Sequence, residues 1–327
     1  MNHRIFPKTG WKVSEVGLGC WQIGGDCWGD LSEQKAYDIL SAAVDSGVTF
    51  LDTADVYGAG RSEEFIGNFL KSRSESLHIA TKLGRRDHVF PDQFTEKNLR
   101  ECLEDSLSRL GVPIIELAQL HCPPAKIFRD GNVFKLMSQF QSEGLISNWG
   151  ASVESMEEAL ICLEQPDCVS LQIIFNIFRQ KPISTLFEKA KEKGVGLIVR
   201  LPLASGLLSG KMQRYQHFAE NDHRKFNCDG QLFNVGETFA GLPFPIGIDI
   251  ANKVKSILPS TSPMAKSAIR WILDHDAVTT VIPGASSGEQ AKSNAAASDL
   301  PSLSVQTHEE LRDLYEAEIK DRIRGPY

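Results

Sequence analysis

Eight short apolar runs recur along this chain, and each is followed at some distance by a segment with helical periodicity. The runs are apolar throughout rather than alternating, as expected for strands that are buried on both faces. They cover residues 17–21, 48–52, 77–82, 114–121, 145–152, 169–175, 195–201 and 278–283. Eight strand–helix units predict an α/β fold, namely a closed (β/α)8 TIM barrel that forms one domain over residues 1–327.

The segments between these runs have helical patterns with recognisable ends. Ser32 and Thr95 are placed as N-caps, and Gly47, Gly111 and Gly194 as stops. The predicted helices cover 31–46, 62–71, 95–110, 132–143, 156–163, 183–192 and 263–273, with 289–297 and 309–323 closing the chain. A doubly wound open sheet is the rival fold, but it would need a Gly-x-Gly-x-x-Gly turn after the first strand, and residues 17–22 lack one.

One long insertion interrupts the alternation. Residues 212–262 have no clear strand or helix pattern and fall between the seventh and eighth predicted strands. Loops of this length in a compact barrel are usually lids or binding loops. We therefore expect an irregular lid at 212–262 on the side of the barrel where function resides.

Composition excludes several functional classes. A net charge of −7 gives no reason to expect a nucleic acid or an anionic membrane as partner. No apolar run approaches the ~18 residues needed to span a bilayer. The first residues lack the apolar stretch of a signal peptide, and the seven cysteines lack paired spacings. These features predict a cytoplasmic protein with free thiols.

Three predicted strands end in, or just before, an ionisable residue. These residues are Asp52, Lys82 and His121, and Tyr57 follows Asp52 by five positions. In a parallel barrel such strand ends meet on the face where chemistry occurs. The pKa of free tyrosine is about 10, and a nearby ammonium lowers it. The four side chains suit protonation of a carbonyl oxygen while a hydride reaches its carbon, and a nicotinamide cofactor must supply that hydride.

Each of the four residues has a commoner structural role when it occurs alone. An aspartate after a strand is usually a turn residue, and a tyrosine beside a loop usually lines a wall. Their joint occurrence at successive strand ends favours catalysis. Another enzyme class remains open, namely a Schiff-base aldolase that uses Lys82.

The chain resembles the aldo-keto reductases over nearly its whole length. The resemblance is carried by Asp52-Thr-Ala-Asp-Val-Tyr57-Gly58, Ala80-Thr-Lys82, Leu120-His121, Gly150-Ala-Ser152, Leu171-Gln172 with Asn176, the run 202–211, and Ile282-Pro283-Gly284 with Asn294. It implies a barrel that holds extended NADP or NAD across its mouth and reduces an aldehyde, ketone or sugar. It also implies Tyr57 as general acid, supported by Asp52, Lys82 and His121.

The same resemblance implies where the cofactor is held. Ser152 and Gln172, with Asn176 as a further candidate, would hold the nicotinamide; the loop 203–211 would cover the pyrophosphate, and 284–294 the adenosine. The predicted cofactor-binding residues are Gly19, Trp21, Ser152, Gln172, Arg200, Leu203, Gly206, Ser209, Lys211, Gly284, Ser286, Gln290 and Asn294. Barrels that resemble this one also serve as non-catalytic, cofactor-sensing subunits of larger assemblies, so that function remains open as well. The substrate, the reaction direction and the oligomeric state stay open.

The sequence departs from the family pattern at three places. Val153 stands where an asparagine is usual, and Arg200 stands where many members have an aromatic residue that stacks on the nicotinamide. A guanidinium also stacks, but it carries charge, and a salt bridge is its alternative role. Residues 284–290 contain no basic side chain for a 2′-phosphate, so we predict that both NADP and NAD are accepted. No metal is expected, because His121 and Cys122 lack the usual ligand spacing.

Overall fold

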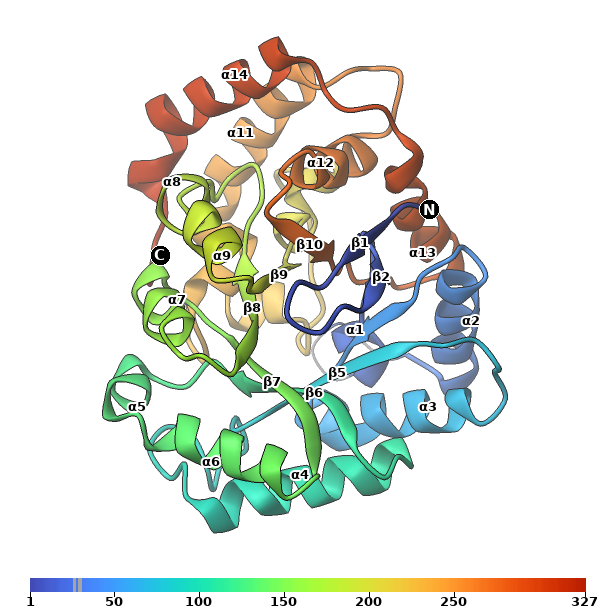
Figure 1. Ribbon diagram of the computed structural model, residues 1–327. Helices are drawn as coiled ribbons and strands as arrows, with labels where there is room; N and C mark the ends of the chain where they lie inside the picture. Colours follow the sequence, from blue (N-terminus) through green and yellow to red (C-terminus); the bar gives the residue numbers. More distant parts are fainter. Residues whose placement is uncertain (26–27, 29–30) are drawn as a thin grey trace.

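Eight parallel strands close into a barrel at the centre of the computed structural model, which describes residues 1–25, 28 and 31–327 (Figure 1). Neighbouring strands follow chain order, and parallel bridges from Val16 to Val281 and from Gly19 to Gly284 join the last strand to the first. The strands are β3 (Leu18–Gly19), β4 (Phe50–Asp52), β5 (His78–Leu83), β6 (Ile115–His121), β7 (Ile146–Ser152), β8 (Cys168–Ile174), β9 (Gly196–Arg200) and β10 (Val278–Val281). The predicted fold class is confirmed.

The first strand is shorter than the predicted run 17–21. Strand β3 ends at Gly19, and Trp21 begins the short helix α1 (Trp21–Gly24) instead. The backbone N–H of Cys20 still donates to the carbonyl of Asp52 at 2.8 Å, so the chain turns away only after that bond. This turn brings Trp21 to the mouth of the barrel, where it lines a cavity.

A ring of helices covers the outside of the barrel (Figure 1). Ser32 and Thr95 cap their helices as predicted, and Gly111 ends α4 in the left-handed conformation with φ of 67°. The helices are α2 (Glu33–Val44), α3 (Arg61–Leu70), α4 (Glu96–Leu110), α5 (Ala125–Asp130), α6 (Asn132–Ser142), α7 (Met156–Leu163), α8 (Pro182–Thr185), α9 (Phe187–Glu192), α10 (His223–Phe226), α11 (Phe244–Ile257), α12 (Met264–Leu273), α13 (Gly288–Ala295) and α14 (Val305–Leu314). None of the described helices is long and apolar enough to cross a membrane.

Two predicted helices differ from the structure. The segment 183–192 is broken at Leu186 into α8 and α9. Leu186 and its neighbour Phe187 are both buried, and consecutive positions of one straight helix point about 100° apart. The closing helix predicted at 309–323 begins earlier, at Val305 after the N-cap Ser304, and gives way to a π-helical turn at Tyr315–Ile319.

An N-terminal hairpin closes the end of the barrel opposite to the strand C-termini. Its strands, β1 (His3–Ile5) and β2 (Lys12–Ser14), were not predicted because three-residue strands show no periodicity. Phe6 and Val13 pack against interior residues such as Phe50 and Leu117. A Cβ at Gly196 would lie 2.5 Å from the Phe6 ring, so this plug depends on a glycine at the start of β9.

The insertion 212–262 lies between β9 and β10, the seventh and eighth barrel strands, as predicted. It is not irregular, however, and that expectation was wrong. It contains α10, two 3-10 turns at Val235–Glu237 and Phe239–Gly241, and the 14-residue helix α11. Ile248, Ala251 and Val254 of α11 are buried in the main hydrophobic core. The helical pattern of α11 is hard to recognise in the sequence because Pro243 precedes the helix and Pro245 and Gly247 stand in its first turn.

Residues 212–234 therefore form the part of the insertion that remains a candidate lid. Tyr215 is 87% exposed and Leu232 is 75% exposed, whereas α11 is anchored by its buried face.

Limited proteolysis with chymotrypsin should cut first after Tyr215 or Leu232 and spare α11. Bound NADPH should slow the cut, because Gln216 and Phe218, next to Tyr215, line the cavity. Equal cleavage with and without NADPH would show that residues 212–234 do not close over the cofactor and are not a lid.

Candidate active site

A buried ion pair lies at the C-terminal ends of β4 and β5. The Lys82 Nζ is 2.5 Å from Asp52 Oδ1, and both residues are at most 2% exposed. The ammonium also donates to the carbonyl oxygen of Thr53 at 2.8 Å and to the Tyr57 hydroxyl at 3.1 Å. All three donor positions of the ammonium are therefore used, and one of them is directed at the phenol.

The second carboxylate oxygen of Asp52 accepts two amide bonds. Gln172 Nε2 on β8 donates to Oδ2 at 2.7 Å, and Gln119 Nε2 on β6 donates at 3.0 Å. Gln119 was missed by the sequence reasoning. Its signal was present, because an amide inside an apolar strand two residues before His121 projects on the same side as His121.

Tyr57 begins a tight turn directly after β4. Gly58 has φ of 61°, and a Cβ there would lie 2.3 Å from the carbonyl oxygen of Gly24, so the turn requires glycine. The phenol ring stacks on Trp21 with centroids 5.9 Å apart and meets His121 edge-on at 5.8 Å. These contacts hold the hydroxyl between Lys82 and the cavity.

The structure corrects the expected pKa of Tyr57. Burial raises this pKa above its usual value, and the lowering effect of Lys82 is smaller than that of burial. Burial alone would lower the pKa of Lys82, but the charge of Asp52 and the phenol of Tyr57 outweigh it and raise that pKa. At neutral pH the phenol thus keeps its proton, and the ammonium is positioned to stabilise a phenolate once the proton has left.

His121 is a neutral imidazole. Burial lowers its pKa well below the usual value, and the cations Lys82, Arg85 and Arg200 add to the effect. Its Nδ1 is buried and has no hydrogen-bond partner among the described residues. A neutral imidazole beside the phenol suits binding of a carbonyl oxygen without competition for the proton.

One cavity of about 980 Å³ opens above these groups. Asp52, Tyr57 and His121 line it, while Lys82 lies beneath them. All thirteen predicted cofactor-binding residues line the same cavity: Gly19, Trp21, Ser152, Gln172, Arg200, Leu203, Gly206, Ser209, Lys211, Gly284, Ser286, Gln290 and Asn294. The volume is at the upper end for ligand pockets, as a dinucleotide and a substrate together would need.

The cavity wall fits an extended, anionic dinucleotide. Gly284 approaches Gln22 so closely that a Cβ would lie 2.0 Å from the Gln22 amide oxygen, so a larger residue would displace the Gln22 side chain in the cavity wall. The N-terminus of α13, with Ser286 and Ser287 in the wall, offers backbone N–H groups to a phosphate. Asn176, the further candidate, is buried and is not among the residues that line this cavity. Its amide donates to the carbonyl oxygen of Leu201 at 2.9 Å, and its contact with the nicotinamide stays a prediction.

Strained backbone gathers around the mouth of the barrel. Several non-glycine residues have φ between 47° and 58°, namely Cys122 after β6, Leu201, Ala204 and Ser205 after β9, and Phe239 and Ala240 in the insertion. The Ser205 hydroxyl donates to the carbonyl of Glu237 and accepts from the N–H of Phe239, both at 3.1 Å. Such conformations persist only where surrounding structure enforces them, and they cluster at functional sites.

Arg200 forms the salt bridge that was its alternative role, and its stacking on the nicotinamide stays a prediction. It lines the cavity, and its Nη1 lies 3.2 Å from Glu237 Oε1 of the insertion. Its Nη2 donates to the carbonyl oxygen of Val153 at 3.2 Å, so the residue that departs from the family pattern contributes its backbone. Glu237 was not predicted, because nothing in a loop sequence indicates which strand end it will meet.

The mouth of this parallel barrel holds a phenol, an ammonium and a carboxylate beside a cavity that is large enough for a dinucleotide, as an oxidoreductase of this fold would require. The chain belongs to the aldo/keto reductase family, whose model matches residues 15–316. It is therefore an oxidoreductase that acts on a small carbonyl compound with NAD(P)H.

Individual relatives agree with this assignment. The chain is 28% identical over 320 residues to the uncharacterized oxidoreductase YqkF of Bacillus subtilis (strain 168), covering 96% of this chain and 95% of that protein. The holo form of an aldo-keto reductase from Bacillus halodurans is similar with a TM-score of 0.78 and 27% identity, over 98% of this chain and 99% of that chain. A glycerol dehydrogenase from Gluconobacter oxydans is similar with a TM-score of 0.80 and 26% identity, over 100% and 98%.

Tyr57→Phe removes only the hydroxyl and should lower kcat by about 10²–10⁴-fold, the usual contribution of general acid catalysis. Cofactor affinity should change little, because the ring and its contact with Trp21 remain. Steady-state kinetics and fluorescence titration of the cofactor measure the two effects. Tyr37→Phe on α2 is the matched control, because its hydroxyl bonds to Glu33 on the same helix and Tyr37 does not line the cavity. A Tyr57→Phe enzyme that keeps more than about a tenth of the activity has another proton donor.

Lys82→Met should lower the free energy of unfolding by ~3–5 kcal/mol, because it leaves the buried carboxylate of Asp52 unpaired. Combining it with Asp52→Asn should recover part of the loss by removing that charge. Urea unfolding curves measure both variants. Lys97→Met, at an exposed position on α4, should change stability by less than about 0.5 kcal/mol. A Lys82→Met protein as stable as Lys97→Met would contradict the structural role of the pair.

Proposed function

We propose that this protein reduces the carbonyl group of an aldehyde, ketone or sugar to an alcohol, with Tyr57 as the proton donor. The observation that carries the proposal is the bond from the Lys82 ammonium to the Tyr57 hydroxyl, at 3.1 Å, at the wall of the large cavity. The similarity to a glycerol dehydrogenase supports alcohol–carbonyl chemistry of this kind.

The nicotinamide, when bound, supplies the hydride to the carbonyl carbon. The protein side chains manage the oxygen. Neutral His121 binds the carbonyl oxygen, and Tyr57 transfers its proton to that oxygen. The ammonium of Lys82 then stabilises the phenolate, and Asp52 keeps the ammonium charged and in place.

Ser152 and Gln172 are the proposed anchors of the nicotinamide carboxamide. Gln172 already donates its amide N–H to Asp52, so its carbonyl oxygen is the group left to accept from the carboxamide. The Ser152 hydroxyl lies 3.5 Å from that oxygen and lines the same cavity. The ring position is thus coupled to the ion pair through one amide.

The two alternative functions are less well supported. A Schiff-base aldolase needs an unprotonated lysine, but Asp52 and Tyr57 raise the pKa of Lys82 and hold it as an ammonium. A non-catalytic sensing subunit needs no proton donor, yet the phenol, ammonium, carboxylate and imidazole are all assembled.

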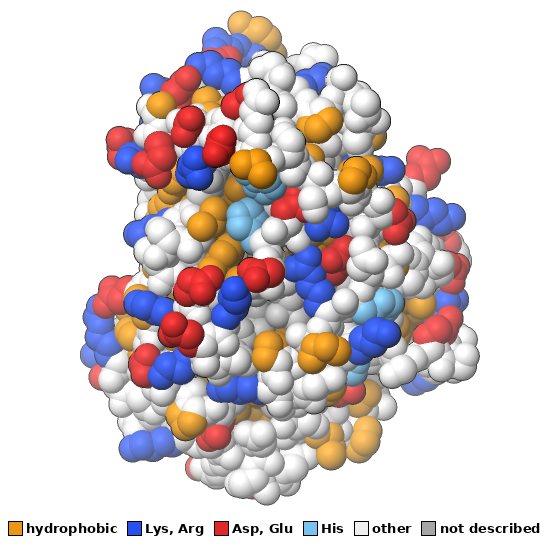
Figure 2. All heavy atoms as spheres, turned by 45° about the horizontal axis from the view of Figure 1, so that its top comes forward, with side chains coloured by type: hydrophobic (Ala, Val, Ile, Leu, Met, Phe, Trp, Pro, Cys, Tyr) orange, Lys and Arg blue, Asp and Glu red, His pale blue; other side chains and the backbone are white. Residues whose placement is uncertain are grey.

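On the face shown in Figure 2, acidic and basic side chains are interspersed, without the basic patch that nucleic acid binding requires. A cytoplasmic location stays a prediction.

A turnover screen against aldehydes, aldoses and ketones with NADH and NADPH tests the proposal. Reduction of at least one carbonyl class, abolished in Tyr57→Phe, is the expected result; no turnover of any class would contradict it.

We expect both NADH and NADPH to be accepted, with kcat/KM values within about a hundredfold of each other. This ratio corresponds to the ~3 kcal/mol that one or two charged hydrogen bonds supply. Residues 284–290 offer no cation, and Glu289 lines the cavity. A preference for NADPH over NADH above about a thousandfold would mean that a cation such as Lys211 or Arg224, which also line the cavity, selects the 2′-phosphate.

A further inference from the structure

Four charged side chains from separate loops meet beside the catalytic groups. We call this set the charged wall: Arg85 after β5, Glu154 after β7, Arg200 at the end of β9, and Glu237 in the insertion. Arg85 Nη1 lies 3.6 Å from Glu154 Oε1 and 3.5 Å from Glu237 Oε1, and Arg200 Nη1 lies 3.2 Å from the same Glu237 oxygen. The four side chains are only 11–18% exposed.

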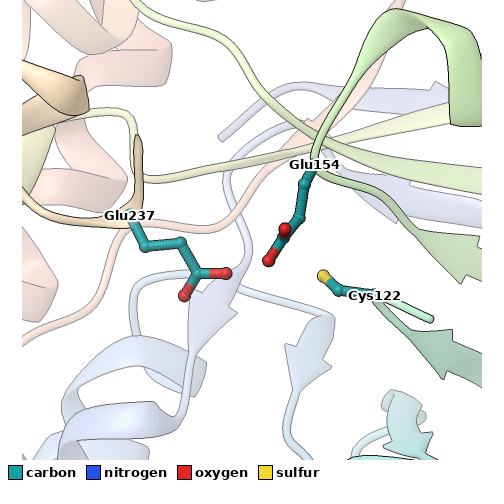
Figure 3. A group of neighbouring side chains, drawn as sticks. All are labelled: Cys122, Glu154 and Glu237. Atoms are coloured by element: carbon teal, nitrogen blue, oxygen red, sulfur yellow. The ribbon is translucent and has the colours of Figure 1, made fainter. Parts of the chain in front are cut away.

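The charged wall is not a metal site, although its acidic groups converge. Cys122, Glu154 and Glu237 point toward one another, with ligand atoms within 4.8 Å (Figure 3). The guanidinium of Arg85, however, already lies against both carboxylates. Burial raises the pKa of the Cys122 thiol to about 11, so it carries no charge that would attract a cation. When both carboxylates are ionised, two cations and two carboxylates balance within the wall.

The balance matters because the cofactor ring changes its charge. The nicotinamide ring must lie beside the carbonyl group that Tyr57 protonates, and Arg200 and Glu237 line the same cavity as Tyr57. The oxidised ring is cationic and the reduced ring is neutral. A guanidinium without a counter-charge in so buried a position would repel the oxidised form only, and such repulsion is stronger there than in water.

We propose that Glu237 is the counter-charge that allows Arg200 to face the cofactor without discriminating against its oxidised form. The inference rests on the proposed function and deepens it. Glu237 acts through Arg200 and is thus a positioning and specificity-determining residue rather than a catalytic one. With Glu237 in place, the site binds both redox forms with similar affinity, and substrate and cofactor concentrations set the reaction direction. The insertion thereby contributes to the electrostatics of the cofactor site.

Glu237 is held ready for this role. Burial alone would raise its pKa, but Arg200 and Arg85 outweigh burial and lower it, so the carboxylate is ionised at neutral pH. The Ser205 hydroxyl and the backbone of Phe239 fix the turn that carries it. The Glu237 side chain is thus both charged and fixed in position.

Glu154 gives the charged wall a dependence on pH. Burial raises the pKa of Glu154 to about 7, and the charge of Glu237 adds to the effect. The groups that face Glu154 are Arg85, Arg200, Glu237, Glu158, the thiol of Cys122 and the buried guanidinium of Arg179. As the pH falls through about 7, Glu154 takes up a proton and the wall gains one excess positive charge; at higher pH the charges of the wall balance.

The test compares dissociation constants of NADP⁺ and NADPH, measured by quenching of tryptophan fluorescence, since Trp21 lines the cavity. Glu237→Gln should weaken NADP⁺ binding relative to NADPH about tenfold, equivalent to ~1.4 kcal/mol. Asp222→Asn is the matched control. It also removes a carboxylate of the insertion from the cavity wall, but its partner Arg224 stacks on Trp28 and Phe218, so the ratio of the two constants should not change.

A double-variant cycle separates charge compensation from structural damage. Arg200→Met combined with Glu237→Gln should return the ratio to within about threefold of the wild type, because both partners are gone. A ratio that stays high in the double variant, or a change below about threefold in Glu237→Gln, would overturn the role of Glu237. Equal weakening of both forms would overturn it as well. Failure of the wild-type protein to bind either form would overturn the proposed function itself.

The pH dependence of the wild type provides a second measurement that needs no variant at Glu237. The ratio of NADP⁺ to NADPH dissociation constants should rise as the pH falls through about 7, as Glu154 takes up its proton. Protonation of the shared 2′-phosphate cancels in this ratio. Glu154→Gln should give the low-pH ratio at every pH. A wild-type ratio that does not change between pH 6 and 8.5 would contradict the electrostatic account.

Discussion

The buried pair of Lys82 and Asp52 is the constraint on which the site depends. Neither charge is stable alone at 1–2% exposure, so each requires the other and further hydrogen bonds. These bonds come from Thr53, Gln119 and Gln172, which belong to three different parts of the barrel mouth. The pair therefore fixes the relative positions of β4, β5, β6 and β8, and its remaining donor fixes the phenol.

The same constraint explains why the site stays in its working protonation state. Burial pushes phenols, carboxylates and imidazoles toward their neutral forms. Tyr57 and His121 follow burial and are neutral, whereas Lys82 has a carboxylate beside it and remains charged. The proposed proton donor, the proposed carbonyl-binding group and the cation that would stabilise the phenolate thus lie within one contact network. These protonation states are the ones that the site adopts at neutral pH.

Much of this architecture was predictable from the sequence because it is local. The eight buried strands have continuous apolar runs, and Ser32 and Thr95 are recognisable as the N-caps of their helices. Asp52, Lys82 and His121 stand at strand ends. The misses have physical reasons. Helix α11 begins among prolines, and the strands of the N-terminal hairpin are too short to show a period. The net pKa of Tyr57 depends on its burial, which no sequence motif near Tyr57 reveals.

The charged wall marks where sequence reasoning ends. Arg200 was recognisable as a departure, because it stands where an aromatic residue is usual, but its partner was not. Glu237 lies 37 positions away in an insertion with no motif, and Arg85 and Glu154 follow other strands. A substituted charge in a cofactor site must be balanced by other charges, and the fold rather than the sequence order decides which residue supplies the balance. In this barrel Glu237 of the insertion lies against Arg200 in the cavity wall, so the insertion contributes to the electrostatics of the cavity.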